Sequence, residues 1–223
     1  MSILLISSII AIIGIVLNIY GVQKIREVKA LEFLNRSMLI KIFSNMLFLS
    51  GWIARVQGYG FLYPLLFMVA GFLILIIALI IFWGVHKEIY IERTELLIIP
   101  TGILLLTNEM QFTIPRIRTL MINAFGTGLV FMASSFAIYN CYKLYRKRRG
   151  GATLWLMIAL YALTILLINT LGLILTFYEV LGILTIWDIL SIHLSSLILP
   201  DLVAFYSAYY YVKKIRPILI ELE

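Results

Sequence analysis

A single carboxylate stands in one of the most apolar parts of this sequence. Asp201 follows Pro200 within an apolar stretch, and the next basic residue along the chain is Lys213. At ~1.5 Å per residue in a helix, Asp201 lies about 18 Å before Lys213, near the middle of a hydrocarbon core ~30 Å thick. A charged side chain at that depth costs roughly 2.5–3.5 kcal/mol. We therefore expect Asp201 to face a bundle interior and to be protonated, because no Lys or Arg is expected at its depth.

Neutral polar side chains are the partners that we expect for Asp201. Asn169 and Thr170 lie in the middle of another apolar stretch, and Asn108 lies in a third. Glu109, beside Asn108, is a second candidate acid, nearer to the outer surface. Intramembrane acids of this kind indicate either a proton-linked or ligand-contacting site, or a hydrogen-bonding group that holds helices together. Both interpretations stay open.

His193 completes the candidate polar site, on the same stretch as Asp201. Ser196 is three residues after His193, close enough to share a helix face, but no strained Gly-x-Ser-x-Gly turn accompanies this pair. The other histidine, His86, is expected at the opposite membrane face, so the two cannot share a haem or a zinc ion. Cys141, the single cysteine, excludes an intramolecular disulfide and a cysteine-based metal site. We expect no metal, no cofactor and no enzymatic activity.

The elements that must position these side chains follow from the composition. The chain has 223 residues, of which 63% are hydrophobic and 13% charged, with a mean hydropathy of +1.05. Too few polar residues remain to cover the surface of a soluble fold. We therefore predict a single all-α domain, a polytopic integral membrane bundle of seven transmembrane helices. The apolar stretches that predict the seven spans are 2–20, 38–54, 62–85, 95–114, 119–141, 153–177 and 190–212.

Basic residues predict the orientation of these spans. If all seven stretches cross, three of the 18 Lys and Arg residues, namely Arg55, Arg116 and Arg118, fall on one side and fifteen on the other. Short cytoplasmic loops are enriched in Lys and Arg, so the N-terminus is expected outside and the C-terminus in the cytoplasm. The fifteen are Lys24, Arg26, Lys29, Arg36, Lys41, Lys87, Arg93, Lys143, Arg146, Lys147, Arg148, Arg149, Lys213, Lys214 and Arg216.

The fourth stretch, 95–114, is the weakest of the seven because it contains Pro100, Asn108 and Glu109. If it did not cross, the basic residues of the later cytoplasmic loop and of the C-terminus would fall outside. Seven crossings are therefore favoured over six. The same distribution explains the net charge of +7 by contact with anionic lipid headgroups, so we expect no nucleic-acid partner.

A near-repeat relates the first and fifth stretches. Ile19-Tyr20 is followed by Lys24, and Ile138-Tyr139 is followed by Lys143. Both stretches run inward, so a parallel 3+1+3 duplication would place them in equivalent positions. This layout is similar to that of the SWEET and PQ-loop transporters, although Gln23 follows Val22 where that family has a Pro-Gln pair. An aromatic belt followed by inward basic residues would give the same pattern without duplication.

The sequence favours a ligand-binding or sensor-like bundle, or an accessory subunit of a membrane complex. The alternative is a small-solute or proton-linked transporter of 3+1+3 layout. Expected partners are the lipid bilayer of the cell membrane and, for an accessory role, other membrane subunits or a second copy of the chain.

Overall fold

The computed structural model describes residues 2–60, 62–88, 115–147 and 151–217, and these residues form helices and short turns without any strand. The long helices are α1 (Ser2–Ile25), α2 (Glu32–Val56), α3 (Leu62–Lys87), α5 (Pro115–Arg146) and α6 (Ala152–Val180). The last part of the chain forms α7 (Ile186–Ser196) and α8 (Ile198–Tyr210), followed by the π-helical turn Tyr211–Ile215. A 3-10 turn, Lys29–Leu31, precedes α2.

Six helical segments of the described chain are long and apolar enough to cross a membrane. The prediction of an all-helical membrane-type bundle is therefore confirmed for these residues. The six are Leu5–Ile25, Glu32–Val56, Leu62–Lys87, Asn123–Arg146, Ala152–Val180 and Trp187–Ile215. The predicted fourth span, 95–114, lies outside the described residues.

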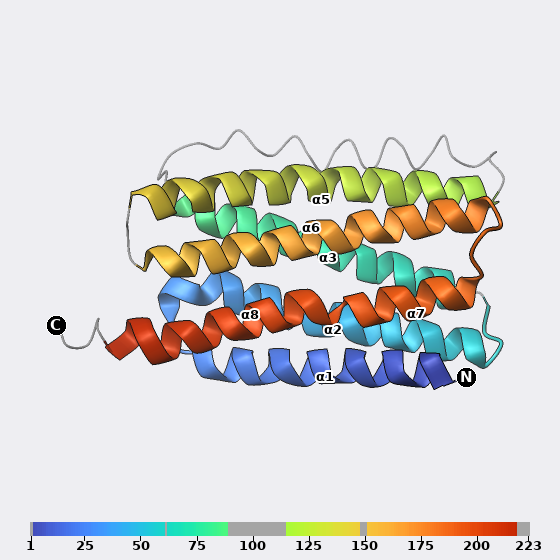
Figure 1. Ribbon diagram of the computed structural model, residues 1–223, viewed down its shortest axis with the longest axis horizontal. Helices are drawn as coiled ribbons and strands as arrows, with labels where there is room; N and C mark the ends of the chain where they lie inside the picture. Colours follow the sequence, from blue (N-terminus) through green and yellow to red (C-terminus); the bar gives the residue numbers. More distant parts are fainter. Residues whose placement is uncertain (1, 61, 89–114, 148–150, 218–223) are drawn as a thin grey trace.

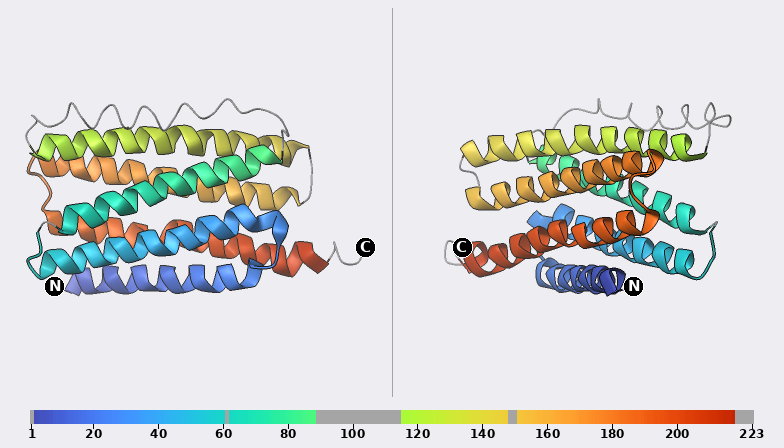
Figure 2. Two further views of the ribbon diagram at one scale, coloured as in Figure 1. Left: turned by 180° about the vertical axis from the view of Figure 1, so that it is seen from behind. Right: turned by 45° about the vertical axis from the view of Figure 1, so that its right-hand side comes forward.

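The long helices lie side by side (Figures 1 and 2), and the contacts between neighbouring helices form a closed ring. Around the ring, α1 contacts α2, α2 contacts α3, α3 contacts α5, and α5 contacts α6. The last span, α7 with α8, closes the ring because it packs against both α6 and α1. The first and last helices of the chain are thus neighbours, and a site between them draws on both ends of the sequence.

Two consecutive described helices, α3 and α5, run in the same direction. Figure 1 shows that α3 ends at the end of the bundle where α5 also ends, whereas α5 begins at the opposite end. The helices α1, α3, α5 and α8 all finish at this shared end, where α2 and α6 begin. The basic residues near these helix termini are therefore gathered at one end of the molecule.

The last span is interrupted at Leu197, between α7 and α8. Pro200 lies in the first turn of α8, where its missing N–H cannot bond to the turn before it. Leu197 keeps helical backbone angles (φ −60°, ψ −22°), and its N–H donates to the carbonyl oxygen of His193 four residues earlier (3.2 Å), so the two halves stay nearly continuous. At its start, α7 has a capping box, in which Thr185 and Asp188 bond to each other's backbone N–H. The interruption places Asp201 just after the break.

Apolar side chains cover the outside of the bundle as well as filling most of its core. Large apolar side chains such as Ile6, Val16 and Phe43 are exposed, whereas Asn18 and Lys41 are buried. This distribution suits a hydrocarbon solvent, in which polar groups must find partners inside the protein. The buried polar side chains are accordingly the first place to look for function.

Candidate functional site

Asp201 lies at the centre of a buried polar cluster formed by α1, α2 and α8. Its carboxylate is 0% exposed and accepts two hydrogen bonds, from Asn18 Nδ2 to Oδ1 (2.6 Å) and from Asn45 Nδ2 to Oδ2 (2.7 Å). Lys41 Nζ lies 3.6 Å from Asp201 Oδ1 and donates a hydrogen bond to Asn45 Oδ1. We call these four side chains the Lys41–Asp201 cluster.

Helical spacing explains how α2 contributes two members of the cluster. Lys41 and Asn45 are four residues apart, so they lie one above the other on the same helix face. Because Asn45 accepts from Lys41 and donates to Asp201, its amide is oriented by charged groups on both sides. The α2 face thus supplies both a counter-charge and a neutral hydrogen-bonding group to the same carboxylate.

A glycine on α1 permits the close approach of this carboxylate. A Cβ atom at Gly14 would overlap Asp201 Oδ2. Asn18 lies one turn further along α1 and bonds to the other carboxylate oxygen. The α1 surface therefore offers a hollow for the carboxylate followed by an amide donor. Any larger residue at position 14 would push Asp201 out of its place.

The expectation that no cation reaches Asp201 is wrong. With the predicted second span beginning at residue 38, Lys41 lies near its inner end and is counted with the cytoplasmic residues, but α2 begins at Glu32. Lys41 therefore lies about 14 Å along the helix axis, at ~1.5 Å per residue, and its side chain is 1% exposed. The structure gives Asp201 a basic partner, so the argument for a protonated carboxyl, which rested on the absence of one, no longer holds.

The neutral partners predicted for Asp201 bond elsewhere. Asn169 donates to the carbonyl oxygen of Ile165 and Thr170 to that of Leu166, both within α6. Asn108 and Glu109 lie outside the described residues. The actual partners are Asn18 of α1 and Asn45 of α2, which the sequence analysis did not select. In the sequence Asn45 follows Ser44 and stands four residues after Lys41, whereas Asn18 is isolated in an apolar stretch.

His193 lies apart from the carboxylate, on α7. Its ring packs edge-on against Phe48 of α2, with ring centroids 4.9 Å apart, and faces Gly172 of α6. The Ser196 hydroxyl donates to the backbone carbonyl of His193 (2.7 Å), so in this arrangement it does not use the imidazole as a base. Among the described residues, no group of three or more His, Cys, Asp and Glu side chains is placed to hold a metal ion.

Two buried polar atoms close to the cluster lack a protein partner within the described residues. These are Asn18 Oδ1 and the Tyr161 hydroxyl, whose side chains are both 0% exposed. Asn18 belongs to the cluster, and Tyr161 lies on α6, which packs against α8. An unsatisfied buried polar group costs about 1–3 kcal/mol, so these atoms would gain from any rearrangement that brings them a partner.

The Lys41–Asp201 cluster is suited to holding or releasing a charge rather than to a covalent reaction. Lys41 and Asp201 together are neutral as an ion pair, and a proton gained by the carboxylate would leave the ammonium without its counter-charge. The cluster has no exposed surface through which a large substrate could reach it in this conformation.

Comparison of the chain with protein-family models, curated proteins and solved structures finds no match.

Proposed function

We propose that the protein is a sensor-like bundle of seven spans in the cell membrane, which switches between two helix arrangements. The observation that carries this proposal is the Lys41–Asp201 pair, enclosed by Asn18 and Asn45 at the junction of α1, α2 and α8. The pair holds one arrangement, and a signal that breaks the pair releases α8 from the other two helices.

A buried ion pair is a poor choice for stability alone. Removing two charges from water is expensive, and a well-packed apolar pair of similar volume is often at least as stable. A pair in hydrocarbon nevertheless creates a strong preference for one arrangement, because breaking it exposes an uncompensated charge. Ionisable residues inside membranes commonly mark functional elements for this reason.

The position of Asp201 just after a helix break supports a switching role. The interruption at Leu197 separates α7 from α8, and Pro200 prevents a continuous hydrogen-bond ladder between them. Leu197 itself keeps helical backbone angles (φ −60°, ψ −22°), but Pro200 has no N–H to donate to the carbonyl oxygen of Ser196, and a proline position of this kind can act as a hinge when one half of a span moves. Movement of α8 against α1 and α2 would break the ion pair without unfolding either half of the last span.

Seven crossings with the N-terminus outside are part of the proposal. Support comes from the common direction of α3 and α5, because two consecutive spans of like direction require a further crossing between them (Figure 1). Support for the orientation comes from the basic residues gathered at the end where α1, α3, α5 and α8 finish. Those among the described residues are Lys24, Arg26, Lys29, Arg36, Lys87, Lys143, Arg146, Lys147, Lys213, Lys214 and Arg216.

Distance measurements between spin labels test the switch. Gln23, near the end of α1, and Arg216, beyond α8, are exposed and can carry labels as cysteines once buried Cys141 is replaced by alanine. The Asp201→Asn variant should shift the label-to-label distance distribution by a few ångströms, the range of helix shifts in switching proteins. The matched control is Glu32→Gln, which breaks an exposed ion pair on the same helix α2 and should leave the distribution unchanged.

An unchanged distribution in Asp201→Asn would reject the switch. If that variant were also less stable, the cluster would be a structural element, which is the role expected in an accessory subunit. A shift of equal size in the Glu32→Gln control would also reject the proposal, because any charge change would then produce it.

A transporter of 3+1+3 layout is the second candidate, and the order of the helices around the ring favours it. Rotation by half a turn around the ring would replace α1, α2 and α3 by α5, α6 and the last span, and each pair of equivalents runs in the same direction. The Lys41–Asp201 cluster would then join the two halves. Proton uptake into vesicles containing the protein, driven by a candidate solute gradient and absent in Asp201→Asn, would favour the transporter over the sensor.

A further inference from the structure

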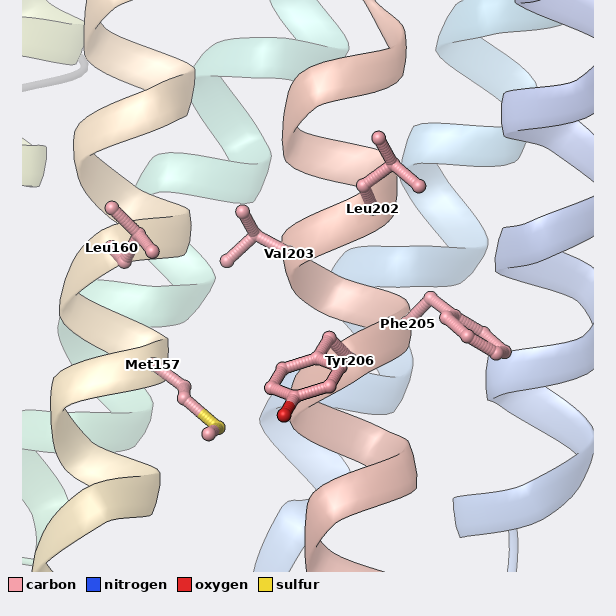
Figure 3. Close-up of a pocket in the computed structure, with 6 residues that line it drawn as sticks. All are labelled: Met157, Leu160, Leu202, Val203, Phe205 and Tyr206. Atoms are coloured by element: carbon pink, nitrogen blue, oxygen red, sulfur yellow. The ribbon is translucent and has the colours of Figure 1, made fainter.

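An apolar groove lies between α6 and α8, apart from the Lys41–Asp201 cluster. Its volume is about 500 Å³, and Figure 3 shows Met157 and Leu160 of α6 facing Val203 and Tyr206 of α8 across it. Leu202 and Phe205 complete the lining. Leu160 and Tyr206 are 47% and 56% exposed, so the groove opens to the outside of the bundle, where the acyl chains of the bilayer would be.

The groove lies close to the basic end of the bundle. Helix α6 begins at Ala152, so Met157 lies about 8 Å along its axis, at ~1.5 Å per residue. The end of the last span packs against this start of α6, because a Cβ at Gly151 would lie only 2.6 Å from Ile215 Cδ1. Ile215 is flanked by Lys214 and Arg216, both exposed. Positive charge therefore stands at the end of the groove nearest the membrane surface.

A continuous exposed stripe joins the groove to this charge. Leu202, Tyr206, Tyr209 and Lys213 follow one another at helical spacing, and all four side chains are exposed. Lys213 Nζ lies 6.0 Å from the centre of the Tyr209 ring, which holds the ammonium group over this stripe. A molecule lying along the stripe would meet apolar side chains first and an ammonium group at the surface.

The half-turn rotation around the ring relates the interface of α6 and α8 to that of α2 and α3, and there a side chain fills the space between the helices. There, the Phe33 side chain of α2 packs onto Gly84 of α3 so closely that a Cβ at Gly84 would overlap its ring. This contact is near the same end of the bundle, where α2 begins and α3 ends. The groove between α6 and α8 is thus a difference between two otherwise similarly arranged helix pairs.

We propose that this groove holds one acyl chain of an anionic phospholipid, with the phosphate group bound by Lys213, Lys214 and Arg216. The lining is wholly apolar except for the Tyr206 hydroxyl, and the cationic side chains complement a phosphate at headgroup depth. A transmembrane helix fits less well, because helix–helix contacts in membranes use small residues and none of the six lining residues is small. The proposal does not depend on the switch described above.

Native mass spectrometry of the full chain in detergent tests the site. The probes are phosphatidylglycerol and phosphatidylcholine with identical acyl chains, and the apparent Kd is measured for each lipid. Wild-type protein should bind phosphatidylglycerol more tightly. The double variant Lys213→Gln/Lys214→Gln should weaken phosphatidylglycerol binding about 30-fold, at roughly fivefold for each basic residue, and leave phosphatidylcholine binding unchanged.

The matched control for charge is Lys24→Gln/Arg26→Gln, which removes the same charge from the same end of the bundle but beside α1. It should leave the lipid preference unchanged. The matched pair for the groove is Val203→Trp, which should fill it and weaken both lipids, and Leu167→Trp, which adds the same ring at an exposed site of α6 away from the lining and should weaken neither.

Two results would overturn the proposal. Equal loss of phosphatidylglycerol preference in both charge variants would show that any surface charge suffices. Full lipid binding in a folded Val203→Trp variant would show that the groove is not the site. If Val203→Trp does not fold, the two charge variants still decide the matter, because their side chains are exposed and their loss should not disturb packing.

Discussion

Asp201→Asn removes one charge from a buried ion pair and leaves the other in place. The variant keeps the size of the side chain, and its amide oxygen can accept from one of the two asparagines. Its NH2 group can donate to Asn18 only if the Asn18 amide turns over to present Oδ1, because Asn18 and Asn45 both donate through Nδ2. Lys41 loses its counter-charge. At the observed 3.6 Å, and with an effective dielectric constant of about 20, the attraction between the two charges is roughly 4–5 kcal/mol. Loss of one partner from a buried pair typically costs about 3–5 kcal/mol.

The measurement is a double-mutant cycle on thermal unfolding in detergent, with Asp201→Asn, Lys41→Met and the double variant. Asp201→Asn alone should lower Tm by on the order of 10 °C. Lys41→Met alone should also be destabilising, because it leaves an unpaired carboxylate. The double variant should be far more stable than the sum of the two losses predicts, since no charge then remains in the cluster. The exposed Glu32–Arg36 pair is the control, and Glu32→Gln should change Tm little.

Two results would refute this reasoning. If Asp201 were protonated and bonded only to amides, Asn would replace it at a cost within about 1 kcal/mol, the scale of one net hydrogen bond. A small effect of Asp201→Asn would therefore show that Lys41 does not depend on the carboxylate. Simple additivity of the two single variants would show that the two charges do not interact.

Two further predictions follow from the packing and from the charge distribution. Gly14→Ala should destabilise the protein by roughly 1–3 kcal/mol in the same unfolding assay, because the new Cβ would overlap the Asp201 carboxylate. Gly126→Ala, with open space around it, should be neutral or slightly stabilising. Equal effects of the two variants on stability would show that the close approach at Gly14 is unimportant. In a protein whose native cysteine is replaced, a membrane-impermeant thiol reagent applied to intact cells should label Gln57→Cys and spare Lys147→Cys, because the proposed orientation places the basic end in the cytoplasm. Labelling at position 147 would reverse that orientation.

The sequence predicts the helices well because the hydrocarbon environment selects them by length and apolarity. Five of the predicted spans fall within single described helices, and the sixth, 190–212, covers the end of α7, the break and α8. The break itself was marked by Pro200, but its position at Leu197 depends on how the two halves pack. The seventh crossing, 95–114, stays a prediction.

The polar site was predictable only in part. The depth of Asp201 and the cost of exposing it to lipid correctly predicted a buried carboxylate with hydrogen-bonding partners. The basic partner was missed because Lys41 lies only three residues into the span predicted from residue 38 and was counted with the cytoplasmic residues, whereas α2 begins at Glu32. The missed signal is the spacing of Ser37, Lys41 and Asn45, which repeats every four residues and marks one polar helix face. Which helix meets Asp201 depends on tertiary packing, which the sequence pattern does not specify.

The Lys41–Asp201 pair also has a consequence for biosynthesis. Its two halves lie at opposite ends of the chain, and 156 residues separate Asn45 from Asp201. At roughly 5–20 residues per second, the ribosome completes the carboxylate on the order of 8–30 s after α2. During that interval the α2 lysine enters the bilayer without its acid. Chains released before α8 is made would retain this uncompensated cation, which gives membrane quality control a chemical mark for recognising incomplete copies.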